Sequence, residues 1–267
     1  MKPSRSQGDW FWVIFELSRV TFLDIVRDKI LYNSLFFGMI VFLLGALSSQ
    51  FTVSHPGRMV IDFGLTGVSL SLNALALLLG AGLLSKEIER RTLYVTLSRP
   101  ITRMQFLLGK YFGLAKILLL NWIFLSVAYS VLILVFQVDD HPPAQVVFVG
   151  LGFALLEALM VGVLALLFST FTTTSLSVMF VLGIYLIGKN MTELILLIKR
   201  MDHGFPRLLL AAMTYIIPNF EQFGIGSQVT YGIAIPNAYV FAGLGYTLAV
   251  ILVALSASGL IFNQREL

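Results

Sequence analysis

The stretch that decides the fold is Val146–Phe168, VVFVGLGFALLEALMVGVLALLF, an apolar run in which Glu157 is the one charged residue. The hydrocarbon core of a bilayer is about 30 Å thick, and a helix that crosses it needs about 20 mostly apolar residues. Backbone groups cannot stay unpaired in lipid, so such a run must be helical. We therefore predict a transmembrane helix here.

Five further runs satisfy the same criterion, and together they predict an all-α membrane protein with six transmembrane helices. Only 12% of the 267 residues are charged and 58% are hydrophobic, whereas about a quarter of the residues in a soluble domain are charged. The absence of cysteine excludes a disulfide framework and a Cys-based metal site. We take residues 30–267 as one six-span domain. The five runs are Ile30–Phe51, Ile61–Leu84, Tyr111–Gln137, Leu176–Ile198 and Tyr239–Phe262.

Lysine and arginine are concentrated on one side of the predicted spans. Loops rich in these residues stay in the cytoplasm, so the distribution places both termini and the loop Ser85–Lys110 there. This topology accounts for the net charge of +4 and gives no reason to expect a nucleic-acid partner. The basic residues on this side are Lys2, Arg5, Arg19, Arg27 and Lys29 before the first span, and Lys86, Arg90, Arg91, Arg99, Arg103 and Lys110 in the loop.

Residues 1–29 are predicted to form a cytoplasmic amphipathic helix that lies in the membrane interface. Charged residues such as Glu16, Arg19 and Asp24 recur near helical spacing, beside large side chains such as Trp10 and Trp12. An interfacial helix combines these two kinds of face. The alternative is a short extra span, but this many charges are costly in hydrocarbon.

The segment 85–110 reads SKEIERRTLYVTLSRPITRMQFLLGK, which is more apolar than the alternative, a solvated loop, requires. Ser85 is predicted to cap a cytoplasmic helix with Glu87 in its first turn. Pro100 breaks that helix and starts a second one that runs into the third span. We expect these two short helices to lie against lipid headgroups or a cytoplasmic partner.

The outer segment 199–238 contains Pro206, Pro218 and Pro236, but also the apolar stretch Leu208–Ile217. It is too long for a turn and too broken for a span. We predict short helices that dip into the outer leaflet, with protein covering their broken ends.

Several polar side chains within the predicted spans are candidates for lining a polar path, or simply for bonding helix to helix. They are Asn73, Asn121, Glu157 and Lys189, with Ser69 and Ser71 nearby. Counted from the outer ends, Glu157 is about 16 Å deep and Lys189 about 14 Å, so they can pair across antiparallel helices. Alternatively, the fifth span ends near Gly188, and Lys189 reaches the outer headgroups.

No residue set typical of catalysis or of a metal site is found. His55, His141 and His203 lie on the predicted outer side and share no metal-ligand spacing. Thr172–Ser175 lies on the other side, where we predict a tight turn whose hydroxyls cap the fifth helix. Gly183–Asn190, GIYLIGKN, matches P-loop spacing except at its last position, but it lies in an apolar span. We predict no enzyme activity and no cofactor in this chain.

The segment SKEIERRTLYVTLSRPITRMQFLLGKYFG is similar to the link between the second and third spans of bacterial ABC type-2 permeases. The family's E-x-E-R-x-T motif, Ser-Arg-Pro-like turn and Gly-Lys pair correspond here to Glu87, Glu89, Arg90 and Thr92, then Ser98-Arg99-Pro100, then Gly109-Lys110. Tyr215–Ile225, YIIPNFEQFGI, and the tail IFNQREL resemble the subgroup related to the nitrous-oxide-reductase maturation permease. The tail departs from that subgroup in having Gln264-Arg265 where two arginines are common.

The resemblance implies the membrane subunit of an exporter in the bacterial inner membrane, paired with a second permease copy or a related chain. ATP and magnesium would bind a separate ABC ATPase subunit. Periplasmic accessory proteins are further candidate partners. The alternative function is a non-transporting membrane anchor or assembly subunit for a cytoplasmic or periplasmic complex. An intramembrane enzyme is disfavoured because no acid–base or metal set is clustered. The implied ATPase-coupling residues are Lys86, Glu87, Glu89, Arg90, Arg91, Thr92, Ser98, Arg99 and Pro100.

Overall fold

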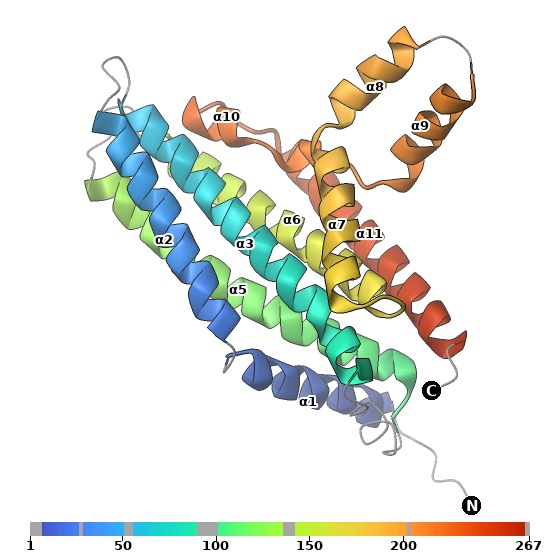
Figure 1. The fold of residues 1–267 in the computed structure, drawn as a ribbon. Helices are drawn as coiled ribbons and strands as arrows, with labels where there is room; N and C mark the ends of the chain where they lie inside the picture. The colour runs from blue at the N-terminus through green and yellow to red at the C-terminus, as the bar shows by residue number, and fades with distance from the viewer. Residues whose placement is uncertain are drawn as a thin grey trace, which may run out of the picture.

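A computed structural model describes residues 7–26, 29–50, 56–89, 101–135, 142–201 and 204–264, and within these ranges the chain is helical without a β-strand (Figure 1). The elements are α1 (Gln7–Val26), α2 (Lys29–Gln50), α3 (Pro56–Glu89), α5 (Arg103–Val135), α6 (Ala144–Ser169), α7 (Thr174–Lys189), α8 (Met191–Arg200), α9 (Phe205–Ile216), the 3-10 turn η1 (Glu221–Phe223), α10 (Gly226–Thr230) and α11 (Asn237–Gln264).

Four helices, α3, α5, α6 and α11, are long and apolar enough to cross a membrane. The pair α7 and α8 passes the same test when it is taken as one broken span, which gives five. The described apolar part of α2 is shorter and covers Ser34–Leu47. The structure therefore supports an all-helical fold with four to five spans, and the count of six stays a prediction.

The run predicted as one fifth span, Leu176–Ile198, is divided into two helices that meet at 71°. Asn190 leaves helical geometry at φ −116° and ψ 37°, and its side-chain Nδ2 donates back to the Leu186 carbonyl at 2.8 Å. A second contact forms at the bend, where the Phe220 amide donates to the Gly188 carbonyl at 3.0 Å. Glycine permits this contact because it has no side chain. A Cβ on Gly188 would lie 2.6 Å from Cδ2 of Phe220. The bend therefore depends on a distant segment, which hydropathy does not register.

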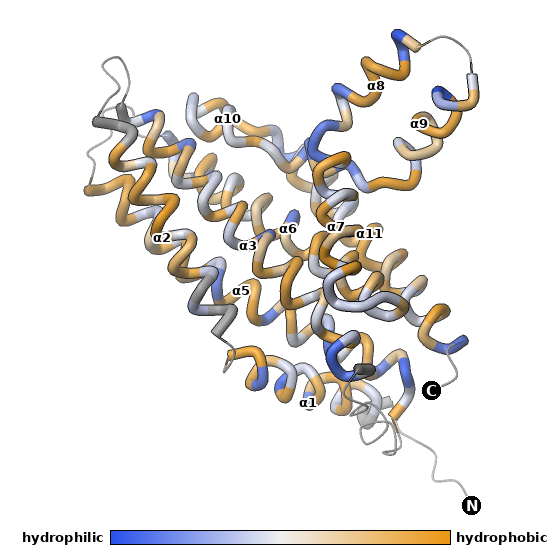
Figure 2. The backbone as a smooth tube through the Cα atoms, viewed as in Figure 1, coloured by the Kyte–Doolittle hydropathy of each residue, from blue (hydrophilic) through white to orange (hydrophobic). Residues whose placement is uncertain are grey.

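The centre of the bundle is the contact between α3 and α6, whose spans are 72% and 67% buried, whereas those of α5 and α11 are only 28% and 22% buried. A Cβ on Gly80 would lie 2.9 Å from the Gly162 carbonyl oxygen and 2.7 Å from Cβ of Ala165. Small residues let helix backbones approach closely in a membrane. Figure 2 shows that hydrophobic residues recur along the whole length of the long helices. Many of them, such as Phe124 and Leu252, are exposed on the surface of the bundle, as lipid contact requires.

The helix α1 lies at one end of the bundle, alongside the first turns of α5 (Figure 1). Its inner side packs on α5, where a Cβ on Gly109 would lie 2.5 Å from Cβ of Leu17 and one on Gly113 2.6 Å from Cβ of Thr21. The predicted N-terminal helix is therefore present from Gln7, and its position in the membrane interface remains a prediction. Its exposed aromatic residues are Trp10, Phe11, Trp12 and Phe15.

At the opposite end, α8 and α9 form an arm that projects from the bundle (Figure 1). None of the residues of α9 is buried. The chain that follows the arm is anchored in the bundle by four buried apolar side chains. They are Phe220, Phe223, Ile225 and Val229. Short helices thus occupy the outer segment 199–238, and their insertion into the outer leaflet remains a prediction.

Three predicted helix ends are wrong. Ser85 does not cap a new helix, because it lies inside α3, which continues to Glu89. The helix expected from Pro100 begins at Arg103. Thr102 and Gln105 form its capping box, since each backbone amide donates to the other's side chain, at 2.8 and 3.2 Å.

The third wrong end is the start of α7, where no side chain caps the helix. Instead, the Thr172 hydroxyl donates to the Phe168 carbonyl at 2.8 Å and lies 2.6 Å from the Ser177 hydroxyl. The threonine run therefore fastens the end of α6 to the first turns of α7 rather than capping α7.

Candidate functional site

Two groups of polar residues lie along α3. One is at its C-terminal end, where α1 lies, and comprises Ser85, Glu87, Lys110 and Thr174; we call it the base cluster. The other contacts the middle of α3 and comprises Ser69, Asn73, Glu157, Tyr185 and Lys189; we call it the outer network.

The base cluster joins the end of α3 to two other helices. The Ser85 hydroxyl donates to the Ala81 carbonyl at 2.6 Å and lies 2.7 Å from the Thr174 hydroxyl of α7. Lys110 of α5 forms an ion pair with Glu87, and both side chains are largely shielded. The end of α3 is therefore fastened to both α5 and α7.

The base of the bundle is closed further by Arg103 in the first turn of α5. Its guanidinium donates to the Phe262 carbonyl of α11 and lies over the Phe262 ring, 5.4 Å from the centroid. Phe106 stacks on the same ring at 6.3 Å between centroids. These contacts join the start of α5 to the end of α11.

Three of the nine predicted ATPase-coupling residues, Lys86, Glu87 and Glu89, fall within the described residues, at the end of α3. Lys86 is exposed, and Glu87 holds Lys110 rather than standing free for a partner. Glu89 is the last residue of α3. Arg90, Arg91, Thr92, Ser98, Arg99 and Pro100 lie outside the described residues, as do His55, His141 and His203. Within the described ranges, no group of His, Cys, Asp and Glu residues could hold a metal.

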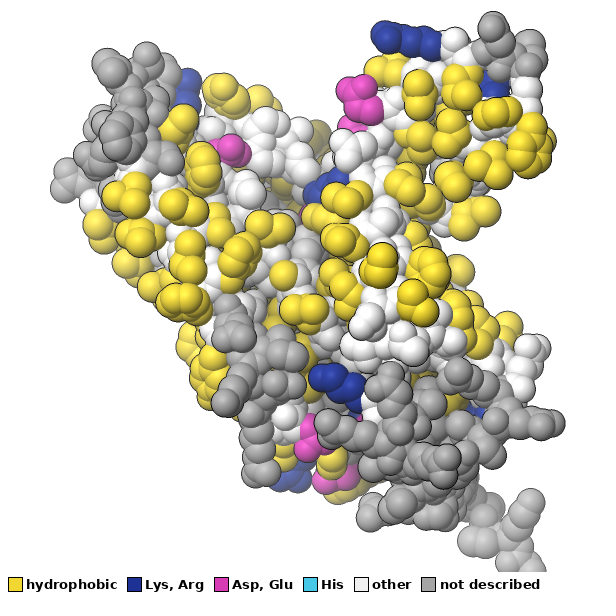
Figure 3. Space-filling model, viewed as in Figure 1, with side chains coloured by type: hydrophobic (Ala, Val, Ile, Leu, Met, Phe, Trp, Pro, Cys, Tyr) yellow, Lys and Arg dark blue, Asp and Glu magenta, His cyan; other side chains and the backbone are white. Residues whose placement is uncertain are grey.

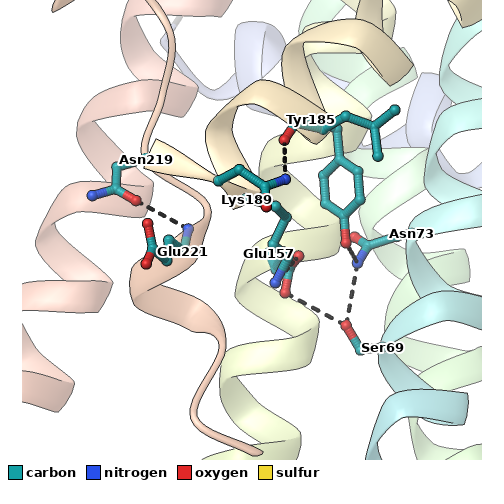
Figure 4. A network of polar contacts seen from close by, with 9 residues as sticks. Ser69, Asn73, Glu157, Tyr185, Lys189, Asn219 and Glu221 are labelled. Carbon is teal, nitrogen blue, oxygen red and sulfur yellow. Dashed lines mark hydrogen bonds and ion pairs between the residues drawn. The ribbon is translucent and has the colours of Figure 1, made fainter. Parts of the chain in front are cut away.

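The outer network is built around an ion pair between Glu157 of α6 and Lys189, the last residue of α7 (Figure 4). The distance from Lys189 Nζ to Glu157 Oε1 is 2.8 Å, and the Glu157 side chain is 1% exposed against 25% for Lys189. Both sequence interpretations of Lys189 hold in part, because α7 does end there and the pair also forms. A charge buried this deeply in a membrane protein needs a partner.

Three further side chains extend the pair to α3. The Ser69 hydroxyl donates weakly to Glu157 Oε2 at 3.5 Å, and Asn73 Nδ2 donates to Ser69 Oγ and to the Tyr185 hydroxyl, both at 3.3 Å. Tyr185 precedes Lys189 by one helical turn, and its ring centroid lies 5.8 Å from Lys189 Nζ. The network therefore binds α3, α6 and α7 together.

Asn121 does not belong to the outer network. Its Nδ2 donates to the Ser34 hydroxyl at 3.3 Å, and Ser34 donates to the Ser71 carbonyl at 3.1 Å. These bonds join α5, α2 and α3, so Asn121 acts as a helix–helix bond. Sequence reasoning missed Tyr185 and the pairing of Lys110 with Glu87. The Tyr-x-x-x-Lys spacing was a signal for Tyr185, whereas Glu87 and Lys110 are joined only by tertiary structure.

A cavity of about 230 Å³ opens beside the ion pair. Glu157, Tyr185 and Lys189 contribute polar groups to its lining, and Ser69 lies at one side. The rest of the wall is mainly apolar and includes Leu65, Leu70, Ala154, Phe223 and Ile225.

A carboxylate in the arm's root fixes the bend near this cavity. The Thr192 amide in the first turn of α8 donates to Glu221 Oε2 at 2.7 Å. This bond holds the pKa of Glu221 below the usual carboxyl value, with Lys189 contributing a smaller effect of the same sign. A carboxylate at a helix N-terminus is favourable, so Glu221 steadies the start of α8.

The apolar helices and the polar network buried between them define a multi-pass membrane protein. Residues 21–267 match the model of the family described as ABC-2 family transporter protein, so the chain belongs to that family. It is therefore a membrane component of a transport system and not itself the catalytic part. No curated protein matches the chain.

Proposed function

We propose that this chain is the permease subunit of an ABC exporter, which pairs with a second permease chain and is driven by separate ATPase subunits that bind ATP and magnesium. The observation that carries the proposal is α3. This helix runs from Pro56 to Glu89, and so it connects the outer end of the bundle to the segment in which the family resemblance is most specific.

Movement at the base has a direct route to the outer side. α7 is bonded to α3 near both of its ends, through Thr174 and Ser85 at the base and through Tyr185 and Asn73 in the outer network. A displacement of the Glu87 end of α3 would therefore carry α7 with it, and α7 leads into the bend and the arm. This arrangement suits a subunit that receives a power stroke on one side of a membrane and responds on the other.

The proposed topology places α1, the end of α3 and the C-terminus in the bacterial cytoplasm. In Figure 1, α1, the end of α3 and the end of α11 share one end of the molecule, which supports a common side. α2 and the broken pair α7–α8 would complete six spans. The arm would dip into the outer leaflet, where the exposed apolar residues of α9, such as Phe205 and Leu208, contact lipid.

We further propose that the transport path lies between two permease copies, identical or related. The subgroup of the nitrous-oxide-reductase maturation permease remains our proposal for the nearest relatives, on the basis of Tyr215–Ile225. It leaves the transported substrate open.

The test is to co-express the chain with a candidate ABC ATPase subunit and to measure co-purification and ATP hydrolysis in nanodiscs. Glu87→Ala and Arg91→Ala should each lose stimulation or detach the ATPase while the protein still inserts. Lys110→Ala should mimic Glu87→Ala, because it removes the other half of the ion pair. Lys199→Ala, on the arm, is the control and should leave stimulation unchanged.

Full coupling in both Glu87→Ala and Arg91→Ala would contradict the assignment of the segment 85–100. Binding of the ATPase without any change in hydrolysis would instead indicate a non-transporting anchor. Labelling of a cysteine placed at position 95 by an impermeant reagent in intact cells would overturn the topology.

A further inference from the structure

The cavity beside the outer network holds a carboxylate that is fixed and a cation that is not. Glu157 lies in the middle of α6 and is 1% exposed, whereas Lys189 is at the end of α7 and is 25% exposed. Lysine carries its ammonium group on a flexible four-carbon stem. The carboxylate is therefore a permanent feature of the cavity, and the Lys189 ammonium can leave it for water.

The surroundings of the carboxylate favour a positive charge. The Tyr185 ring faces the ammonium with its centroid 5.8 Å from Nζ, and ring faces attract cations. Asp62 adjoins the rim, since a Cβ on Gly226 would lie 3.4 Å from Asp62 Oδ1. Glu221 is close enough to Lys189 for that cation to lower its pKa.

Arg58, one turn before Asp62 on α3, lies 5.1 Å from the ring centroid of Tyr231. Among the described residues, Glu157 and Lys189 are the charged side chains that line the cavity. The carboxylates of Asp62 and Glu221 lie nearby, so an anion that displaced Lys189 would meet negative charge, whereas a cation could replace Lys189 on Glu157.

We propose that this cavity binds a small organic cation with a primary ammonium group and an apolar body. The ligand's ammonium would replace that of Lys189 on Glu157, and its body would contact the walls formed by Leu65, Ala154 and Phe223. Lys189 is then a tethered competitor that occupies the site when the ligand is absent. Figure 3 shows the hollow between the arm and the body of the molecule through which a ligand would approach.

This site lies within one chain, and its ligand need not be the transported substrate. Binding also requires no ATPase. If the binding test below fails, the proposed permease function is unaffected. If ATPase coupling fails, the proposed binding site is unaffected.

The test uses the full chain in nanodiscs and two probes, 2-phenylethylammonium and 2-phenylethanol. They share a phenylethyl body and differ in the head group, which is a charged ammonium in the first and a neutral hydroxyl in the second. Binding is measured by saturation-transfer NMR with competition. The wild-type protein should prefer the ammonium probe. Lys189→Met, which keeps the stem and removes the competitor, should bind that probe about tenfold more tightly, and Lys199→Met should bind it as the wild type does. Glu157→Gln should abolish the preference.

A third variant, Asp62→Asn, tests the proposal if the Lys189 or Glu157 variants fold poorly. Asp62 is suitable because it is exposed at the rim of the cavity. This variant should weaken binding of 2-phenylethylammonium several-fold and leave binding of 2-phenylethanol unchanged. Equal affinity of the wild type for the two probes would overturn the proposal, and so would a folded Lys189→Met variant that binds the ammonium probe no better than Lys199→Met.

Discussion

Removing Glu157 and removing Lys189 should lower the stability of the protein by different amounts, because the two side chains are buried to different degrees. Lys189→Met leaves an unpaired carboxylate that is 1% exposed and is poorly hydrated at the wall of the cavity, whereas Glu157→Gln leaves an ammonium group that is 25% exposed and can reach water. Removing one partner of a buried pair and leaving the other charge unpaired costs about 3 kcal/mol or more. Losing a bond whose remaining partner can be hydrated costs about 1 kcal/mol.

These magnitudes translate into melting temperatures that can be measured by scanning fluorimetry in one detergent at pH 7. With about 2–4 °C per kcal/mol, Lys189→Met should melt about 6–12 °C below the wild type and Glu157→Gln about 2–4 °C below it. The control Lys199→Met lies at the end of α8, and it should change the melting temperature by no more than about 2 °C. The swap Glu157→Lys with Lys189→Glu should recover part of the loss. A larger drop for Glu157→Gln than for Lys189→Met would refute the reasoning.

Three further predictions concern contacts that only the structure reveals. Gly188→Ala should destabilise the protein by about 1–3 kcal/mol because its Cβ would overlap Phe220, whereas Gly183→Ala, with nothing within 4 Å, should not; thermal unfolding of the two variants compares them directly. Gly113→Val should release α1 from α5, and faster proteolysis within residues 7–26, with Gly152→Val as the unobstructed control, would show it. Glu221→Gln should lower the melting temperature at pH 7, and because the pKa of Glu221 is depressed from 4.5, this gap should close as the pH falls below that value. A gap that widens in acid would contradict the Thr192 bond as its cause.

The outer network shows how much of the candidate site could be predicted from the sequence alone. Glu157 and Lys189 were recognisable as partners because charges are rare in apolar runs and helix rise fixes their depth. Tyr185 was missed although it precedes Lys189 by one helical turn, since a tyrosine in a span is ordinary until Asn73 of another helix is found 3.3 Å from its hydroxyl. Asn121 looked equivalent to Asn73, and only packing assigned it to Ser34 instead.

Hydropathy by itself determined that this chain is helical and lies in a membrane, because apolar runs of about 20 residues fit a spanning helix, which satisfies its own backbone groups in lipid, and are too long for the strands of a barrel. It also located α3, α5, α6 and α11, whose apolar runs need no partner to be identified. The bend after Lys189 and the pairing of Glu87 with Lys110 were decided by tertiary structure. Each depends on a residue far away in the chain, such as Phe220 docking on Gly188, and contacts between distant segments leave no periodic signal in a sequence.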